Sequence, residues 1–243
     1  MLYFDMGINQ IDVGGPLIER KPSGIAVVRD DFHSLNPDYW STEKIEPGRL
    51  TFGMFEGIDA AKIDLIKGDH QQTSAAGTVT ERGELMEQKD IRLPLGTEAW
   101  YAFSVYFPTD FPIVDNRTVF AQWKQAEEDS SPFLSLRYQG GKIFCRIIGD
   151  EINEKFQLKQ EREIRGGWHR IIMNYQLNPD LTGKVHCQFD EEEFANYVGK
   201  MGHQSLGPST YFKMGLYRDQ IDVPQTIYLA QYRRGSTPAD CQV

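Results

Sequence analysis

The sequence predicts an all-β domain. Helical periodicity is scarce, whereas short runs rich in β-branched and aromatic residues recur and are separated by Gly, Pro, Asn and Asp. Short strands at this spacing are typical of a sandwich, jelly roll or barrel. A chain of 243 residues is long enough for one such unit. We therefore expect a single domain over residues 1–243, with residues 1–29 as an N-terminal arm.

The expected strands lie between Thr80 and Gly235. The aromatic run "AWYAFSVYF" (Ala99–Phe107) ends at Pro108, which cannot donate a ladder hydrogen bond. The segment Ser131–Asp150 predicts a hairpin, because Gly140 and Gly141 can adopt the positive φ angles of a tight turn. The other strand-like segments are Thr80–Glu87, Thr118–Gln125, Gly166–Leu177, Gly183–Asp190, Tyr211–Gln220 and Gln225–Gly235.

Two further features concern the loops and the cysteines. The acidic stretch that follows Phe189 is expected to be a surface loop, with room for one helical turn at Glu191–Tyr197. Its carboxylates could hold a structural calcium ion, although their spacing matches no known calcium loop. Cys145 and Cys187 lie in strand-like runs and are expected in the core, and the cysteine spacing predicts no metal motif.

The net charge of −9 argues against a general nucleic-acid binder, which would carry a basic excess. It still allows a basic groove for an anionic ligand, because charge can be local. No apolar run is long enough for a membrane helix. The N-terminus has an acid at Asp5 and no basic region before an apolar run, unlike a secretory signal. We expect an extracellular protein if a signal has been removed, and a monomer.

The stretch "YFKMGLYRDQ" (Tyr211–Gln220) suggests a binding surface. In a strand, alternation places Phe212, Met214 and Leu216 on one face and Tyr211, Lys213, Gly215 and Tyr217 on the other. Two phenols and an ammonium around a glycine are unusual for a solvent face. They are more typical of the floor of a groove, in which Gly215 would leave room for a sugar ring.

Three other strands carry polar groups opposite an apolar stripe. Alternation pairs Arg82 with Glu84, pairs Ser135 with Arg137, and places Gln122 and Lys124 with Phe120, opposite Trp123. If these faces line one concave sheet, the groove presents guanidinium, ammonium, amide and phenol groups. Such a groove suits a carboxylate-bearing polymer, that is, an anionic polysaccharide.

These groups fit β-elimination on a uronic acid. The C5 proton is weakly acidic until the neighbouring carboxylate is neutralised, which arginine and glutamine do well. A base must then remove the C5 proton while an acid protonates the departing oxygen, and tyrosine can do either when cations lie nearby. Tyr217 has Lys213 and Arg218 close in sequence.

Three motifs resemble those of jelly-roll alginate lyases. "YFKMGLYRDQ" is similar to their "YFKAGxYNQ", "ERGEL" to "R(T/S)EL" and "AQWK" to "Q(I/V)H", in the same order along the chain. The aromatic strand, "GGWHRIIMNYQL" and "IYLAQYRRG" more closely resemble the heparin lyase I and glucuronan lyase group. The resemblance runs from about Arg82 to Gly235. It implies a β-jelly roll, a concanavalin-like two-sheet sandwich with a concave groove, and polysaccharide lyase activity without a required cofactor.

The resemblance also implies roles for individual residues. Arg82 and Gln122 would neutralise the carboxylate, Tyr217 would be the acid and also a candidate base, and Lys213 would bind substrate. Lys124 stands where the alginate-lyase motif has histidine, and lysine is the poorer base near neutral pH. His70 could replace it, with His169 a weaker candidate. The other expected substrate-binding residues are Tyr211, Ser135, Arg137 and Arg218.

Several alternatives remain at this stage. The same groove without an acid and a base would make a non-catalytic carbohydrate-binding jelly roll, and Arg82–Glu84 could be an ordinary surface ion pair. A sandwich-type glycoside hydrolase needs two opposed carboxyls, but the best pair, Glu84 and Glu87, falls on opposite faces of a regular strand. Among substrates a glucuronan-like polymer is our first expectation and alginate the second. Heparin is disfavoured by the net charge of −9.

Overall fold

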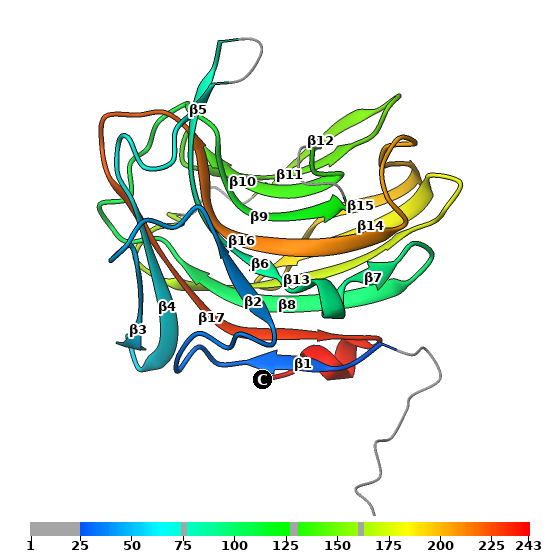
Figure 1. Cartoon of the computed structure of the whole chain (residues 1–243), viewed down its shortest axis with the longest axis horizontal. Coiled ribbons are helices and arrows are strands. Elements are labelled where there is room, and N and C mark those ends of the chain that lie inside the picture. The colour runs from blue at the N-terminus through cyan, green and yellow to red at the C-terminus, as the bar shows by residue number, and fades with distance from the viewer. Residues whose placement is uncertain (1–24, 74–76, 127–130, 160–162) are drawn as a thin grey trace, which may run out of the picture.

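A computed structural model of the chain describes residues 25–73, 77–126, 131–159 and 163–243. It has two antiparallel sheets that lie one over the other as curved layers (Figure 1). One sheet, which we call the back sheet, has the order β15-β14-β13-β8-β17-β4-β3, with β1 paired to β17. The other, the groove sheet, has the order β12-β11-β10-β9-β16-β6-β2, with β5 on β6 and β7 on β16. The expected all-β jelly-roll sandwich is confirmed.

The strand bounds are as follows. The back sheet consists of β1 (Val28–Asp30), β3 (Leu50–Phe55), β4 (Ile58–Leu65), β8 (Glu98–Tyr106), β13 (Trp168–Leu177), β14 (Thr182–Phe189), β15 (Glu192–Lys200) and β17 (Gln225–Gly235). The groove sheet consists of β2 (Trp40–Glu43), β5 (Gln72–Thr73), β6 (Val79–Glu87), β7 (Leu93–Pro94), β9 (Thr118–Gln125), β10 (Leu134–Gln139), β11 (Lys142–Ile148), β12 (Asn153–Gln157) and β16 (Ser209–Asp219). Two 3₁₀ turns, η1 (Lys89–Ile91) and η2 (Pro238–Cys241), complete the described elements.

The core lies between the two sheets and follows the predicted alternation. Phe212 on β16 points into it, where its ring centroid lies 5.4 Å from that of Tyr101 on β8 and 4.7 Å from that of Trp123 on β9. Removing these aromatic rings from water stabilises the contact between the sheets. Because the inner face of β16 is committed to this core, its other face must carry the polar side chains.

A β-bulge changes the predicted face of Phe120. The pairing of β9 with β10 passes from Leu136–Ala121 to Arg137–Val119, so that Phe120 is the extra residue. Its side chain is buried in the core, with its ring centroid 5.3 Å from that of Phe107. The expectation that Phe120 shares the polar face is therefore wrong, and Val119 occupies that face instead.

The acidic segment after Phe189 is also a correction. It was expected to be a loop with a helical turn, but Glu192–Lys200 forms strand β15 at the edge of the back sheet. Its backbone pairs with β14, and a register shift at Cys187/Gln188 leaves the consecutive residues Phe194 and Ala195 both buried. The bulge disturbs the period of two that would have identified the strand.

The chain ends and the cysteines complete the description. Residues 25–29 of the expected arm are part of the fold, since Val28 begins β1 and is buried; residues 1–24 lie outside the described residues. Cys145 and Cys187 are buried and free, as expected, and so is Cys241. Neither of the two short described helices is long and apolar enough to cross a membrane. The single domain and the monomeric state stay predictions.

Candidate functional site

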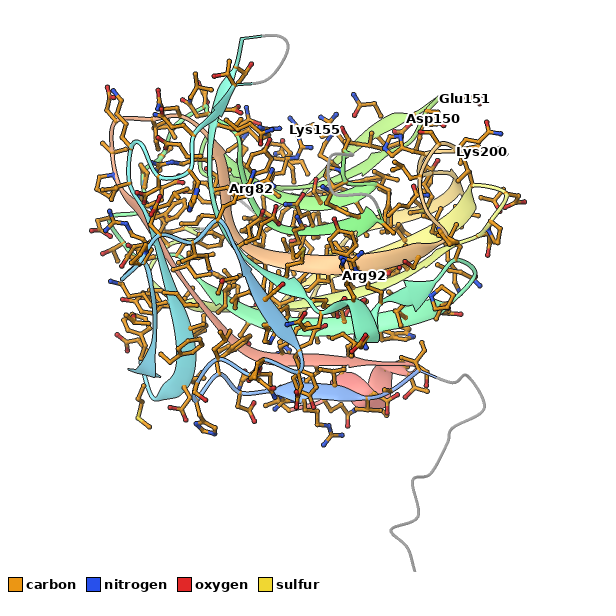
Figure 2. All side chains as sticks on the ribbon, in the orientation of Figure 1. Arg82, Arg92, Asp150, Glu151, Lys155 and Lys200 are labelled. Atoms are coloured by element: carbon orange, nitrogen blue, oxygen red, sulfur yellow. The ribbon has the colours of Figure 1, made fainter. Side chains whose placement is uncertain are left out.

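The outer face of the groove sheet carries a cavity of about 580 Å³. Residues of β2, β5, β6, β9, β10, β11, β12 and β16 line it, so it crosses the strands rather than following one of them. In Figure 2, Arg82 lies beside β2 and β6, and Lys155 lies at β12, the strand at the opposite edge of the sheet. The cationic residues that line the cavity are Lys44, Arg82, Arg117, Lys124, Arg137 and Arg146. Among the described residues, Glu43 is the one acidic residue that lines it.

Strand register brings the predicted residues together in two rows. Arg82 pairs with Tyr217, which pairs with Val119, which in turn pairs with Arg137. In the adjacent row Lys213 pairs with Gln122, and Gln122 pairs with Ser135. Since neighbouring strands lie roughly 4.8 Å apart, each row places polar side chains within reach of one short segment of a polymer.

A buried network of carboxylates and cations supports one end of the groove. An Nη1 group of Arg82 lies 2.8 Å from Oε1 of Glu43, and Lys213 Nζ donates to the other oxygen of Glu43. Gln122 Nε2 donates to Glu84 Oε1 at 2.5 Å, and Arg82 Nε lies 3.4 Å from Glu84 Oε2. The network fixes the orientations of Arg82 and Gln122, which both line the cavity.

The carboxylates in this network have opposite pKa shifts. Burial raises the pKa of Glu84, because its nearby cations compensate only in part. For Glu43, burial acts in the same direction, but Lys213 and Arg82 outweigh it and the pKa is lowered. Glu43 is therefore the anion that holds Lys213 and Arg82 in place, while Glu84 lies completely buried beneath the groove.

Lys124 lines the cavity although it is almost fully buried. Burial, together with the charges of Lys213 and Arg82, lowers its pKa to about 8. A lysine with this pKa is neutral in a large fraction of molecules at mildly alkaline pH, so that it can accept a proton.

Tyr217 also lines the cavity and lies between two guanidinium groups. Arg82 Cζ is 4.2 Å and Arg117 Cζ is 4.8 Å from the centre of its ring. Cations at these distances are attracted to the face of an aromatic ring and fix its orientation. The phenol is therefore positioned by two charged neighbours, one on β6 and one directly before β9.

Gly215 has a different role from the expected one. Its φ is +149°, and a Cβ atom built on it would lie 2.4 Å from the carbonyl oxygen of Gly83 and 2.7 Å from Cα of Glu84. The glycine therefore permits β16 to approach the backbone of β6 at a bulge, where the β9 pairing passes from Met214 to Tyr217. This close approach, rather than room for a sugar ring above the strand, explains why position 215 is a glycine.

The remaining predicted residues have varied positions. Ser135, Tyr211 and Lys213 point to the groove side but are completely buried under its surface. Ser135 Oγ accepts a hydrogen bond from Arg137 Nε at 3.1 Å. The ring of Tyr211 lies under Arg92, 4.2 Å from its Cζ atom.

Arg218 and His70 lie away from the cavity. Arg218 is on the opposite face of β16, completely buried, and pairs with Glu81 at 2.7 Å, so it cannot reach a ligand in the groove. His70 does not line the cavity, and its Nε2 lies 3.4 Å from Glu46. The weaker candidate His169 is on β13 of the back sheet.

The structure also bears on the carboxyl pair and on metal binding. Glu84 lies under the groove, whereas Glu87 points into the core and accepts from Arg234 at 2.7 Å, so that the two carboxyls lie on opposite faces as expected. In the part of the chain that the structure describes, no group of three or more His, Cys, Asp and Glu side chains could hold a metal ion. In the acidic run after Phe189, Glu193 instead pairs with His186 at 2.6 Å.

Sequence reasoning missed Glu43, Arg117 and Arg146. Glu43 ends a strand of only four residues, too short for an alternation pattern. Arg117 precedes β9, where it pairs with Asp219 at 2.7 Å. Arg146 did carry a signal, because it alternates with the buried Cys145 and Ile147 in the predicted hairpin.

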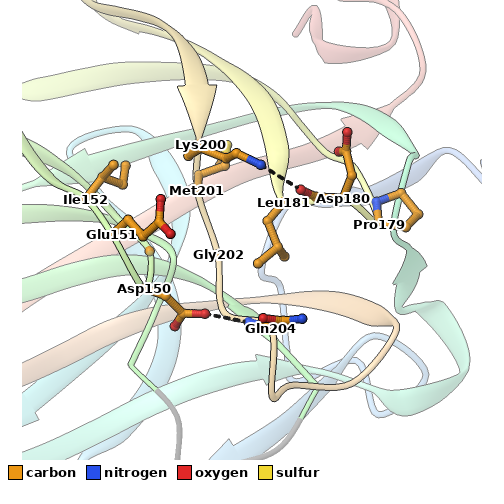
Figure 3. A pocket seen from close by; sticks show the side chains of 11 residues that line it. Asp150, Glu151, Ile152, Pro179, Asp180, Leu181, Lys200, Met201, Gly202 and Gln204 are labelled. Atoms are coloured by element: carbon orange, nitrogen blue, oxygen red, sulfur yellow. Dashed lines mark hydrogen bonds between the residues drawn. The ribbon is translucent and has the colours of Figure 1, made fainter.

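A second hollow of about 290 Å³ lies where the β11–β12 turn, the β13–β14 turn and the end of β15 meet (Figure 3). Asp150, Glu151, Asp180 and Lys200 line it. Asp150 accepts from the backbone of Gln204 at 2.8 Å, and Lys200 Nζ donates to the carbonyl of Asp180 at 3.3 Å. Its excess of carboxylates would repel an anionic polymer, so the basic groove is the candidate site.

Comparisons with known proteins show to which family this chain belongs. Residues 39–233 match the family model described as polysaccharide lyase. The structure is similar to that of an endo-beta-1,4-glucuronan lyase from the fungus Trichoderma reesei, with a TM-score of 0.64 and 16% identity over 88% of this chain and 97% of that chain. No curated protein matches the chain significantly.

Two further solved structures share the fold. An alginate lyase from Chlorella virus matches with a TM-score of 0.56 and 12% identity, covering 82% of this chain and 93% of that one. A beta-glucanase of Bacillus licheniformis matches with a TM-score of 0.57 and 9% identity, covering 87% and 98%. At these identities the likeness shows the fold alone.

Proposed function

Because this chain belongs to the polysaccharide lyase family, we propose that it cleaves a uronate-containing polysaccharide by β-elimination in the basic groove. The observation that carries the proposal is the convergence of Arg82, Gln122, Lys124 and Tyr217 on one cavity. These side chains supply the three functions that the reaction requires, namely carboxylate neutralisation, a base and an acid.

Arg82 and Gln122 neutralise the substrate carboxylate in this proposal. When the C5 proton leaves, negative charge spreads from C5 onto the carboxylate oxygens. Donors that are already oriented stabilise this charge without reorganising. The hydrogen bonds that Arg82 donates to Glu43 and that Gln122 donates to Glu84 provide that orientation.

Lys124 is the proposed base. Its neutral form takes the C5 proton, and its pKa of about 8 makes this form available at mildly alkaline pH. His70 is a weaker choice because it does not line the cavity and lies beside Glu46. Lys124 also occupies the position at which the related motif has histidine.

Tyr217 is the proposed acid. As the C5–H bond breaks, its electron pair forms the C4–C5 double bond, and the C4–O bond breaks. The phenol of Tyr217 gives its proton to the departing oxygen. Lys124 then holds the C5 proton and Tyr217 is a phenolate, so exchange with solvent restores both before the next turnover. No cofactor is required in this scheme, and a structural calcium ion stays a prediction.

A glucuronan-like polymer is the first proposed substrate and alginate the second. The basic groove supports an anionic polymer in either case. The order follows the closer resemblance of the strand sequences "GGWHRIIMNYQL" and "IYLAQYRRG" to the glucuronan lyase group. The glycosidic linkage and the uronate epimer of the substrate, and the endo or exo mode of cleavage, are to be determined with the panel of polymers described below.

The alternative reading is a carbohydrate-binding jelly roll without catalysis. It is disfavoured by the acid and base candidates on one cavity, which binding alone does not need. A glycoside hydrolase is disfavoured because the carboxyls of Glu84 and Glu87 lie on opposite faces of β6.

The test is ultraviolet absorbance of the C4–C5 double bond on a panel of polyuronates, for wild type and Tyr217→Phe. We expect the wild type to release unsaturated product, and the variant to lose about 10²–10⁴-fold in kcat while still binding the polymer. Binding without product from any polyuronate in the wild type would favour the binding module. Product at an undiminished rate from Tyr217→Phe would remove that residue from the mechanism.

A further inference from the structure

A second cluster of cations lies in the groove beside the proposed catalytic residues. Arg137 on β10, Arg146 on β11 and Arg117 next to β9 all line the cavity. Arg137 is two strands from Tyr217 in one row, and Arg146 is two strands from Gln122 in the other. At roughly 4.8 Å between strands, each step of two strands is about 10 Å. Arg137 and Arg146 therefore face a different unit of a bound chain. Arg117, whose Cζ atom lies 4.8 Å from the centre of the Tyr217 ring, lies between that unit and the reacting one.

Among the residues that the structure describes, a hydroxyl rather than a carboxylate holds the guanidinium of Arg137. Its Nε donates to Ser135 Oγ at 3.1 Å, and no carboxylate among the described residues forms an ion pair with it. Burial, with the charges of Arg117 and Arg146, lowers its pKa to about 10. A partly buried cation of this kind is strongly stabilised when a ligand brings an anionic group next to it.

The two neighbouring arginines are also incompletely satisfied. Arg117 pairs with Asp219 through an Nη group, and Arg146 donates to Asn153 through an Nη group. In both residues the Nε atom is buried and has no hydrogen-bond partner among the described residues. Buried donors that lack partners are costly to a folded protein and point to a ligand that satisfies them. Among the described residues, Asp219 is the carboxylate that pairs with Arg117 and acts on the charge of Arg137.

We infer that Arg137, Arg146 and Arg117 form a second anion subsite, which binds the carboxylate of a nearby uronate unit in the same chain. Arginine forks suit carboxylates because they can donate two parallel hydrogen bonds. The inference rests on the proposed function, and it narrows the substrate to polymers in which acidic units recur within one or two positions. Polymers with isolated uronates between neutral sugars would then be poor substrates.

The test uses one polyuronate whose carboxyl groups have been reduced to alcohols at random and to graded extents. If two carboxylates are needed, the initial rate of the wild type follows the square of the remaining carboxylate fraction. A polymer with about half of its carboxylates left would react at about a quarter of the original rate, because each arginine site needs its own carboxylate. For Arg137→Met/Arg146→Met we expect a slower reaction, whose initial rate depends linearly on the remaining carboxylate fraction. On the polymer with about half of its carboxylates left, this variant would keep about half of its own rate on the unreduced polymer.

Controls separate this inference from its premise. Arg29→Met removes a cation from the exposed outer face of β1 on the back sheet, and we expect it to keep the square dependence. Arg137→Lys/Arg146→Lys keeps the charge and is expected to restore part of the rate. Thermal unfolding checks that each variant is folded.

The outcomes are distinguishable. A linear dependence in the wild type, with unsaturated product formed, would overturn the second subsite and leave the lyase proposal standing. The same square dependence in Arg137→Met/Arg146→Met would also assign the second carboxylate to other residues. Absence of unsaturated product from every polyuronate would overturn the proposed function, and this inference with it.

Discussion

Lys124 shows how its surroundings change the chemistry of a side chain. An exposed lysine keeps its proton far above neutral pH, with a pKa of about 10.4. Burial in the groove floor, near Lys213 and Arg82, lowers the pKa of Lys124 to about 8. The residue type that is the poorer base by its ordinary pKa becomes a usable one because of where it lies.

The pH profile tests this role directly. Lys124 must be neutral to act, so kcat/KM should rise with pH and level off above about 8. Lys124→His should keep activity and move the rise toward about 6.5, the usual histidine pKa. Lys124→Arg keeps the charge but cannot lose its proton, and we expect a loss of about 10²-fold or more.

A rise that stays near pH 8 in Lys124→His would mean that another group titrates, and Lys124 would not be the base. The positively charged Arg variant is the matched control, because it shows whether charge alone is sufficient. Measurements of kcat/KM are preferred here because they report groups of the free enzyme, in which the pKa of Lys124 is about 8.

At the scale of the element, the bulged strand β16 positions the proposed acid, Tyr217, and the proposed substrate-binding residue Lys213. Its pairing with β6 is regular from Lys213 to Asp219, whereas its pairing with β9 skips between Met214 and Tyr217. The bulge brings Tyr217 opposite both Arg82 and Val119. Gly215 makes this possible, because its φ of +149° and its contact with β6 exclude a side chain.

Gly215→Ala is therefore expected to destabilise the fold by at least about 2 kcal/mol, from backbone strain and from the clash with β6. It should also lower kcat, because Tyr217 would shift relative to Arg82. Gly53→Ala on β3 is the matched control, since a Cβ atom there meets nothing within 4 Å. Denaturant unfolding and ultraviolet absorbance measure the two effects. Equal stability of the two variants would contradict the role of Gly215.

For the whole molecule, a buried charge pair joins the two sheets. Glu87 of the groove sheet accepts from Arg234 of the back sheet at 2.7 Å, from the Tyr232 hydroxyl at 2.6 Å and from the backbone of Phe212 at 2.9 Å. All of these groups are buried. The pair therefore links the back sheet to the strand that carries Lys213 and Tyr217.

Arg234→Met leaves the Glu87 carboxylate buried without its cation, and we expect a loss of about 3–5 kcal/mol in unfolding free energy. Arg234→Met/Glu87→Gln removes the charge as well and should recover part of the loss. Denaturant titrations of the three proteins measure the difference. A double variant no more stable than Arg234→Met would show that the lost contacts, rather than the unpaired charge, cause the damage.

Much of the fold could be predicted from the sequence because its long strands alternate cleanly. Thr118–Gln125 and Gln225–Gly235 have the predicted bounds, and the hairpin turns at Gly140-Gly141 between β10 and β11. Short strands such as β2 and β5 offer too few residues for a period of two. The edge strand β15 was missed because its acidic start and the neighbouring bulge hide the pattern.

The sequence by itself determined which side chains share a face on each long strand, since alternation is a local property of extended backbone. Only the tertiary structure decided which faces meet. Pairing across four strands brought Arg82, Tyr217, Gln122 and Arg137 to one cavity. The same pairing turned Arg218 to the opposite, buried face of β16, and His70 does not line the cavity. Bulges, burial and neighbouring charges depend on residues far away in the chain, so no local pattern could reveal them.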